Sequence, residues 1–158
     1  ARQDDHNRRL MAPIAVRWGD FEAAFFVGSP GARYFFNRSN GEVDYTSHMD
    51  GPDVRDRILR RTSDDEWLEI PRVTMDDAQV EMREFAQAEA DDTLRAALLE
   101  ALQSATWPRA FNQALGSDQE ARGRWAKARQ AGINRRLLAF CAQHAVVVDA
   151  PEFRALAD

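Results

Sequence analysis

Cysteine and long apolar runs are what this chain of 158 residues has least of. Its single cysteine, Cys141, cannot form an intramolecular disulfide, and it excludes a zinc site built from several cysteines. The longest apolar runs, Ala23 to Val27 and Ala145 to Val148, fall far short of the roughly 18 residues that a membrane-spanning helix needs. The sequence also shows no secretory signal peptide. We therefore expect a cytoplasmic protein without a membrane partner.

What is present is the composition of an ordinary globular protein. Apolar residues make up 44% of the chain and charged residues 30%, with a net charge of −5, which excludes the disordered and fibrous classes. The length fits one domain with short appendages. We predict a flexible leader over residues 1–13, a single domain over residues 14–150, and a C-terminal tail or short helix over residues 151–158.

The strongest local pattern predicts a β-hairpin. Two runs of aromatic and β-branched residues, Arg33 to Asn37 and Glu42 to Thr46, flank the turn sequence Asn40-Gly41. A loop of two residues and one of four give the same alternation of faces, so either is compatible with the pattern. The face predicted to enter the core carries Tyr34, Phe36, Val43 and Tyr45, and Phe35 is the aromatic residue on the opposite, polar face.

A third strand is predicted from Trp67 to Ile70, directly before Pro71. Alternation places Leu68 and Ile70 on the core face of the hairpin. Trp67 then lies on the same side as Phe35, or beneath a helix. Two aromatic residues therefore share a face of the sheet to which the pattern gives no other role.

The remaining segments have helical periodicity. Asp20 is predicted to cap a short helix, and Pro52 suits the first turn of another. From Thr74 onward the pattern is helical throughout: Thr74 with Asp77 resembles a capping box, Asp91 caps the next helix, and Gly116 ends a third. Ser117 is predicted to cap a long helix that ends near His144. The fold class is therefore α+β, a small three-stranded antiparallel sheet followed by a helical C-terminal half.

Two groups of residues resemble catalytic or metal sites only weakly. His48, Asp50 and Asp53 could offer ligands to a divalent cation, but the same sequence is typical of a turn that leads into a capped helix, which we favour. Cys141 and His144 lie one helical turn apart, yet Cys141 falls on the apolar line of its helix, where cysteine is usually a small buried residue. We assign no catalytic residue, metal ligand or cofactor, and the sequence favours a protein that is not an enzyme.

Basic residues are concentrated in the last predicted helix. Acidic residues predominate from Thr62 to Ala105, and basic residues predominate from Trp107 to His144. The simpler interpretation is two solvated faces of one protein. The alternative is a regulator that binds nucleic acid through the helix over residues 118–144, with Arg122, Arg124, Arg129 and Arg136 as the contact residues.

The function that the sequence favours is that of a protein-interaction or adaptor module. Polar catalytic clusters are missing, whereas Phe35 and Trp67 share an unassigned face of the sheet and become the candidate contact residues for an unknown protein partner. The alternative for this pair is a second core layer beneath a helix. Removing either side chain separates these roles, because buried aromatic residues stabilise the fold.

Several short segments together resemble a family of small uncharacterised bacterial proteins. The stretch from Phe35 to Val43 is similar to that family's hydrophobic-L-D-x-x-T-G-E-V motif, with Asn37 in the place of the aspartate. Trp67 to Pro71 resembles its following strand, which ends in Ile-Pro, and Trp107 to Leu115 resembles its F-R-R-F-K-D-x-L helix. Trp125 and the residues after it are similar to the final helix. The resemblance implies an α+β domain, and since the family has no assigned activity it implies no catalytic residues.

Overall fold

The computed structural model describes residues 12–28 and 31–158, which form two compact units. The first unit combines the chain up to Val73 with Ile133–Asp158, and the second is Thr74–Gly132. Residues 1–11 of the predicted leader lie outside the described residues. The single domain expected over residues 14–150 stays a prediction.

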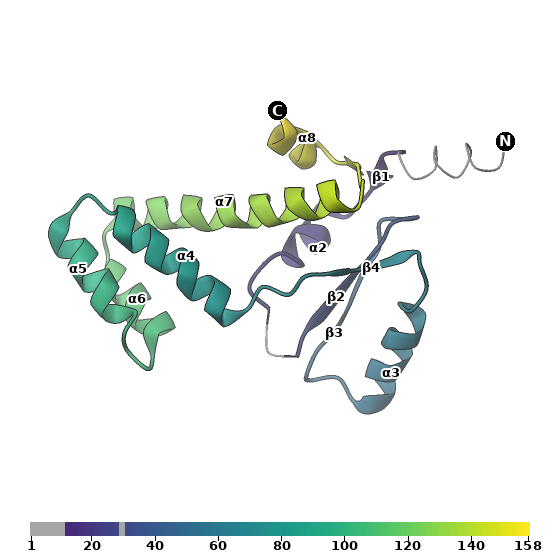
Figure 1. Cartoon of the computed structure of the whole chain (residues 1–158), viewed down its shortest axis with the longest axis horizontal. Helices are drawn as coiled ribbons and strands as arrows, with labels where there is room; N and C mark the ends of the chain where they lie inside the picture. The colour runs from purple at the N-terminus through teal and green to yellow at the C-terminus, as the bar shows by residue number, and fades with distance from the viewer. Residues whose placement is uncertain (1–11, 29–30) are drawn as a thin grey trace. The chain divides into compact units, whose positions relative to one another are not determined.

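The sheet of the first unit has the three antiparallel strands that the sequence predicts. Strands β2 (Arg33–Asn37), β3 (Val43–Thr46) and β4 (Trp67–Ile70) pair in the order β3-β2-β4 (Figure 1). Phe36 lies opposite Val43 on one side and Leu68 on the other, and Asn37 lies opposite Trp67. With the helical C-terminal half, this arrangement confirms the α+β class.

A second, two-stranded sheet joins the ends of the first unit. Strand β1 (Ile14–Ala15) pairs in parallel with β5 (Val148–Asp149), and helix α8 (Pro151–Ala157) follows directly. The C-terminal segment is thus a short helix, one of the two predicted forms. The sequence did not predict the pairing, because strands of two residues are too short to show a periodicity.

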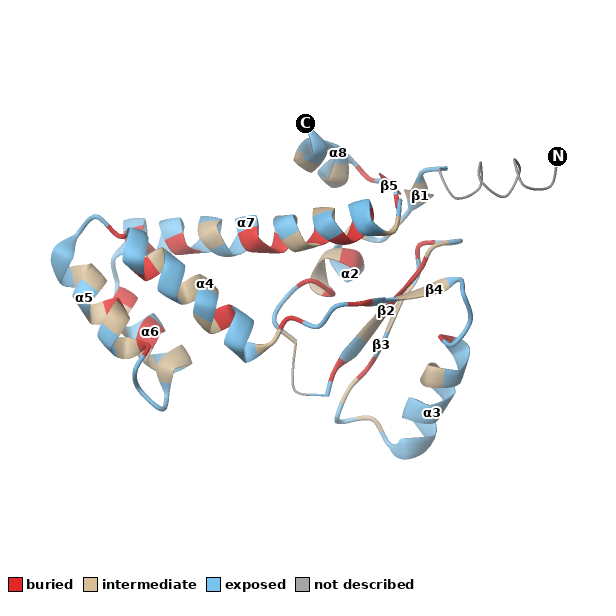
Figure 2. Cartoon of the chain, in the orientation of Figure 1, coloured by how far each residue is buried: buried red, intermediate tan, exposed pale blue. Residues whose placement is uncertain are grey.

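Two helices pack against one face of the three-stranded sheet. Phe36 is fully buried, and its ring centre lies 5.1 Å from that of Phe21 in α2 (Trp18–Ala23) and 6.1 Å from that of Phe140 in α7 (Gln119–Gln143). Ile70 and Leu137 belong to the same core. Figure 2 marks the buried residues of these elements in red. The predicted packing of helices on one sheet face follows from this core.

The predicted core face is right at its centre and wrong at its edge. Tyr34 and Val43 are half-buried, and Tyr45 is 53% exposed, with its ring stacked on Tyr34 at 5.4 Å. On the opposite face, Phe35 and Thr46 are buried. The difference arises because the sheet has two covered faces: helix α3 (Pro52–Arg61) packs beside β3, while Tyr45 lies on an edge strand that the core helices leave open.

The second unit is built from helices alone. These are α4 (Met75–Ala88), α5 (Asp92–Ala101), α6 (Trp107–Leu115) and the part of α7 up to Gly132. Trp125 is 7% exposed, and its ring lies 5.2 Å from those of Phe85 and Phe111. Trp125 is therefore a core residue, as its spacing predicts.

Two of the four predicted N-caps are confirmed and two are wrong. Thr74 and Asp77 form a reciprocal capping box, and Asp91 accepts a hydrogen bond from the backbone N–H of Leu94. Helix α2 begins at Trp18 after Arg17, so Asp20 lies in its first turn and is not its cap. The cap of α7 is Asp118 and not Ser117, because the Asp118 carboxylate accepts from the N–H groups of Glu120 and Ala121 at 3.0 and 3.1 Å.

Replacing Thr74 by alanine is expected to lower the free energy of unfolding by about 1 kcal/mol, because the N–H of Asp77 loses its acceptor. Urea denaturation followed by circular dichroism measures this loss. Thr93→Ala is the matched control, since Thr93 is exposed in the first turn of α5, and we expect a change within about 0.5 kcal/mol. Equal effects of the two substitutions would contradict a capping role for Thr74.

Candidate functional site: a hollow beside Trp67

The structure brings the two predicted aromatic residues to one hollow on the outer face of the sheet. The hollow has a volume of about 600 Å³, and both Phe35 and Trp67 line it. Leu59 and Thr62 line it from α3 and the residue after it, and the loop that follows contributes Asp64 and Asp65. The register of the sheet places Trp67 opposite Asn37 and Glu69 opposite Phe35, which fixes one wall of the hollow.

Phe35 and Trp67 differ in their exposure. Phe35 is only 5% exposed, and the Arg33 guanidinium lies 5.2 Å from its ring centre, so Phe35 forms the floor of the hollow. The alternative role of Phe35, a second core layer, is the one that its burial supports. Trp67 is half-buried, with the Arg61 guanidinium 5.3 Å from its ring centre. Trp67 is therefore the aromatic residue that keeps an accessible surface.

Two arginines near the hollow are fixed by ion pairs. Arg33 donates to both carboxylate oxygens of Glu69, at 2.8 and 2.9 Å, and this hydrogen bonding lowers the pKa of Glu69. The Arg61 guanidinium lies 2.7 Å from a carboxylate oxygen of Glu42 and 3.3 Å from one of Asp44. All four carboxylate–guanidinium contacts are partly exposed, so their main effect is to set the position of the side chains.

Arg38 is a second cation of the hollow, and the sequence pattern does not single it out. It lines the hollow, and its side chain has no ion pair within the described part of the chain. Its backbone N–H donates to the carbonyl of Glu66 at 2.9 Å, which places it beside Trp67. The signal that could have found it is its position in the hairpin loop, directly after a buried strand residue.

The loop that carries Arg38 has a defined structure. It contains four residues between Asn37 and Glu42, which resolves the choice between two and four. The Asn37 side-chain oxygen accepts from the N–H groups of Ser39 and Asn40, at 2.8 and 3.1 Å. Of the Asn-Gly pair only Gly41 has a positive φ, so the turn is not the two-residue type in which both residues do. Asn37 therefore orders the loop from within the sheet.

The candidate nucleic-acid residues do not form a free basic row. Arg122 donates to the carbonyls of Gly116 and Asn112 at the end of α6, the latter at 3.4 Å. Arg124 contacts the Glu89 carboxylate at 3.1 and 3.2 Å. Arg136 donates to the carbonyl of Phe25 at 2.9 and 3.1 Å. Arg129 is exposed. Three of the four candidate arginines thus make contacts within the protein.

The residues considered for metal binding are arranged as a turn. The Asp50 carboxylate accepts from the N–H of Ser47 at 2.7 Å, directly before the helix that Pro52 opens. Across residues 12–28 and 31–158, no three histidine, cysteine, aspartate or glutamate side chains converge as a metal site would require. The His48–Asp50–Asp53 segment is therefore explained by its local structure.

The chemistry of Cys141 is that of a buried thiol. Burial raises the pKa of Cys141 to about 12, so the thiol stays protonated at neutral pH. His144, one turn later, packs its ring against Phe140 with centres 4.7 Å apart. A Cys–His nucleophile needs a thiol that is accessible and has a lowered pKa, whereas the Cys141 thiol is buried and its pKa is raised.

Comparison with known proteins finds no matching family model, no matching curated protein and no matching solved structure. The resemblance of the hairpin, the third strand and the helix from Trp107 to the bacterial family stays a prediction. No helix among the described residues combines the length and the apolar character that crossing a membrane requires.

Proposed function

We propose that this protein is a non-enzymatic interaction module whose hollow beside Trp67 receives a short segment of a partner protein. The observation that carries the proposal is the half-buried Trp67 at the side of a hollow that Phe35 floors. Tryptophan and arginine are the residues that most often dominate the free energy of binding at protein interfaces. In this protein Trp67 and two arginines, Arg33 and Arg38, line the same hollow.

The lining indicates the chemistry of the segment. Leu59 and the Trp67 ring offer an apolar surface, and Arg38 offers a guanidinium without an ion pair among the described residues. An apolar side chain of the partner would pack on Trp67, and a carboxylate of the partner would pair with Arg38. The ion pair of Arg33 with Glu69, both of which line the hollow, orders these side chains before binding, and the ion pairs of Arg61 position its guanidinium over the Trp67 ring. This order reduces the entropic cost of association.

Replacing Trp67 by alanine is expected to weaken peptide binding by at least tenfold. Peptides are selected from a random displayed library on the wild-type protein, and their dissociation constants are then measured by fluorescence polarisation. Arg38→Gln is the second variant, because Arg38 lies in a loop and its removal leaves the core intact. We expect Arg38→Gln to weaken the binding of acidic peptides more than that of neutral ones.

Two matched controls accompany these variants. Tyr45→Ala removes an exposed aromatic residue from the opposite face of the same sheet, and Arg57→Gln removes an exposed charge from α3 that does not line the hollow. Both are expected to leave binding unchanged. Selected peptides whose affinity is indifferent to Trp67→Ala and Arg38→Gln would overturn the proposal.

The single cysteine, which the structure buries as a thiol, accords with a reducing compartment, and we place the module in the cytoplasm. Nucleic-acid binding through residues 118–144 stays an alternative prediction. The contacts of Arg122, Arg124 and Arg136 within the protein leave less of that helix for phosphate groups.

A further inference from the structure

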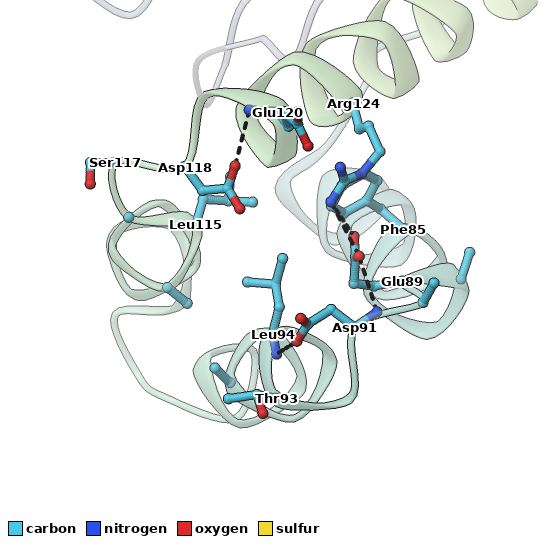
Figure 3. A pocket seen from close by; sticks show the side chains of 15 residues that line it. Phe85, Glu89, Asp91, Thr93, Leu94, Leu115, Ser117, Asp118, Glu120 and Arg124 are labelled. Atoms are coloured by element: carbon cyan, nitrogen blue, oxygen red, sulfur yellow. Dashed lines mark hydrogen bonds and ion pairs between the residues drawn. The ribbon is translucent and has the colours of Figure 1, made fainter.

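The second unit has a larger hollow at one end of its helices. Its volume is about 1020 Å³, and it is bounded by the C-terminal ends of α4 and α6 and the N-terminal ends of α5 and α7 (Figure 3). Leu94 and Leu115 point toward its middle, and Phe85 forms part of its wall. The base of this hollow is therefore apolar.

The polar part of the lining is mainly negative. Its carboxylates are Glu89, Asp91, Asp118 and Glu120, and its cation is Arg124. Arg124 pairs with Glu89, whose side chain is only 6% exposed. Within the described part of the chain, the other three carboxylates have no ion pair. The hollow thus combines an apolar base with three carboxylates that have no ion pair among the described residues.

Two of these carboxylates are held in place by the helix ends. Asp91 accepts from the N–H of Leu94 at 2.7 Å, and Asp118 accepts from those of Glu120 and Ala121. The caps occupy N–H groups that would otherwise attract an anion. Each helix end therefore presents a fixed carboxylate to the hollow, and little conformational entropy remains to be lost on binding.

We propose that this hollow binds a small organic cation, an ammonium or guanidinium group attached to an apolar body. The volume is near the upper limit of small-molecule pockets, which are mostly apolar with a few fixed polar groups. The apolar body would contact Leu94, Leu115 and Phe85, and the cation would pair with a carboxylate at the rim of the hollow, Asp91, Asp118 or Glu120. This proposal is independent of the function proposed for the hollow beside Trp67.

Isothermal titration calorimetry with phenethylamine tests the proposal, with 2-phenylethanol as the neutral compound of the same shape. We expect phenethylamine, which is protonated at pH 7, to bind at least tenfold more tightly than the alcohol. Its affinity should fall as the salt concentration rises. No measurable binding of phenethylamine, or equal binding of the two compounds, would overturn the proposal.

Removing the three unpaired charges is the second arm of the test. In the triple variant Asp91→Asn, Asp118→Asn and Glu120→Gln, asparagine still caps both helices, so the fold is retained. We expect this variant to bind phenethylamine at least tenfold more weakly. The control triple variant Asp76→Asn, Glu84→Gln and Glu100→Gln removes the same charge from the same unit outside the hollow. An equal loss of affinity in the control variant would show that binding depends on net charge alone, and it would overturn the proposed site.

Discussion

Replacing Gly41 by alanine is expected to lower the free energy of unfolding by roughly 3 kcal/mol or more. A Cβ atom at this position would lie 2.1 Å from the backbone oxygen of Ala15 and 3.0 Å from a side-chain carbon of Ile14. Because Ala15 belongs to β1, the clash can be relieved only by moving backbone. That movement would disturb the pairing of β1 with β5.

The backbone conformation of Gly41 adds a second cost. Its φ of +78° lies in the left-handed region, where a side chain costs about 1–2 kcal/mol. Gly31 has nearly the same φ, +79°, but a Cβ there would meet only His48, at an ordinary distance of 3.8 Å. Gly31→Ala therefore measures the conformational cost alone, and the difference between the two variants measures the clash.

Guanidinium denaturation followed by tryptophan fluorescence gives both free energies. A Gly41→Ala variant no less stable than Gly31→Ala would show that the hairpin loop does not pack against β1. Gly123→Ala is a useful third variant, because Gly123 lies inside α7, near its N-terminal end, and a Cβ there meets nothing within 4 Å. We expect it to stabilise the protein by about 1 kcal/mol.

Replacing Phe36 by alanine is expected to lower the free energy of unfolding by about 3–5 kcal/mol. Its side chain is fully buried between Phe21 and Phe140, which come from helices at opposite ends of the sequence. The cavity left by the ring is bordered by the aromatic rings of Phe21 and Phe140, which limits its collapse. We expect the variant to unfold at a lower denaturant concentration, with the largest change for probes in the first unit.

Tyr45→Ala is the matched control, because Tyr45 lies on the same face of the sheet and is 53% exposed. Its loss removes one stacked ring contact with Tyr34 and is expected to cost about 1 kcal/mol. Similar losses for Phe36→Ala and Tyr45→Ala would contradict a core centred on Phe36. Such a result would favour the uniform core face that the alternation of residues predicts.

The hairpin shows which features of the structure the local sequence pattern can predict. The alternation from Arg33 to Thr46 predicts the strands, their pairing and the burial of Phe36. It assigns Tyr45 the same burial as Phe36, because a period of two carries no information on where the covering helices end. The exposure of Tyr45 depends on helices α2 and α7, which are distant in sequence.

The candidate sites, too, were predicted only in part from the local sequence pattern. The sequence places Trp67 and Phe35 on one face, but the burial of Phe35 and the hollow beside Trp67 require α3 and the loop after it to pack beside the sheet. Arg124 belongs to a basic helix in the sequence, and the structure pairs it with Glu89, 35 residues away. The charge pattern alone does not show which cations are already neutralised.

By itself the sequence determined the antiparallel strands, the helices between Thr74 and His144 and the caps at Thr74 and Asp91, because each depends on hydrogen bonds or periodicities within a few residues of the chain. Only the tertiary structure decided which aromatic residues are buried, which arginines contact carboxylates or carbonyls of the protein, and that β1 pairs with β5. These outcomes depend on side chains and backbone groups brought together from distant segments, whose contact energies no local pattern records.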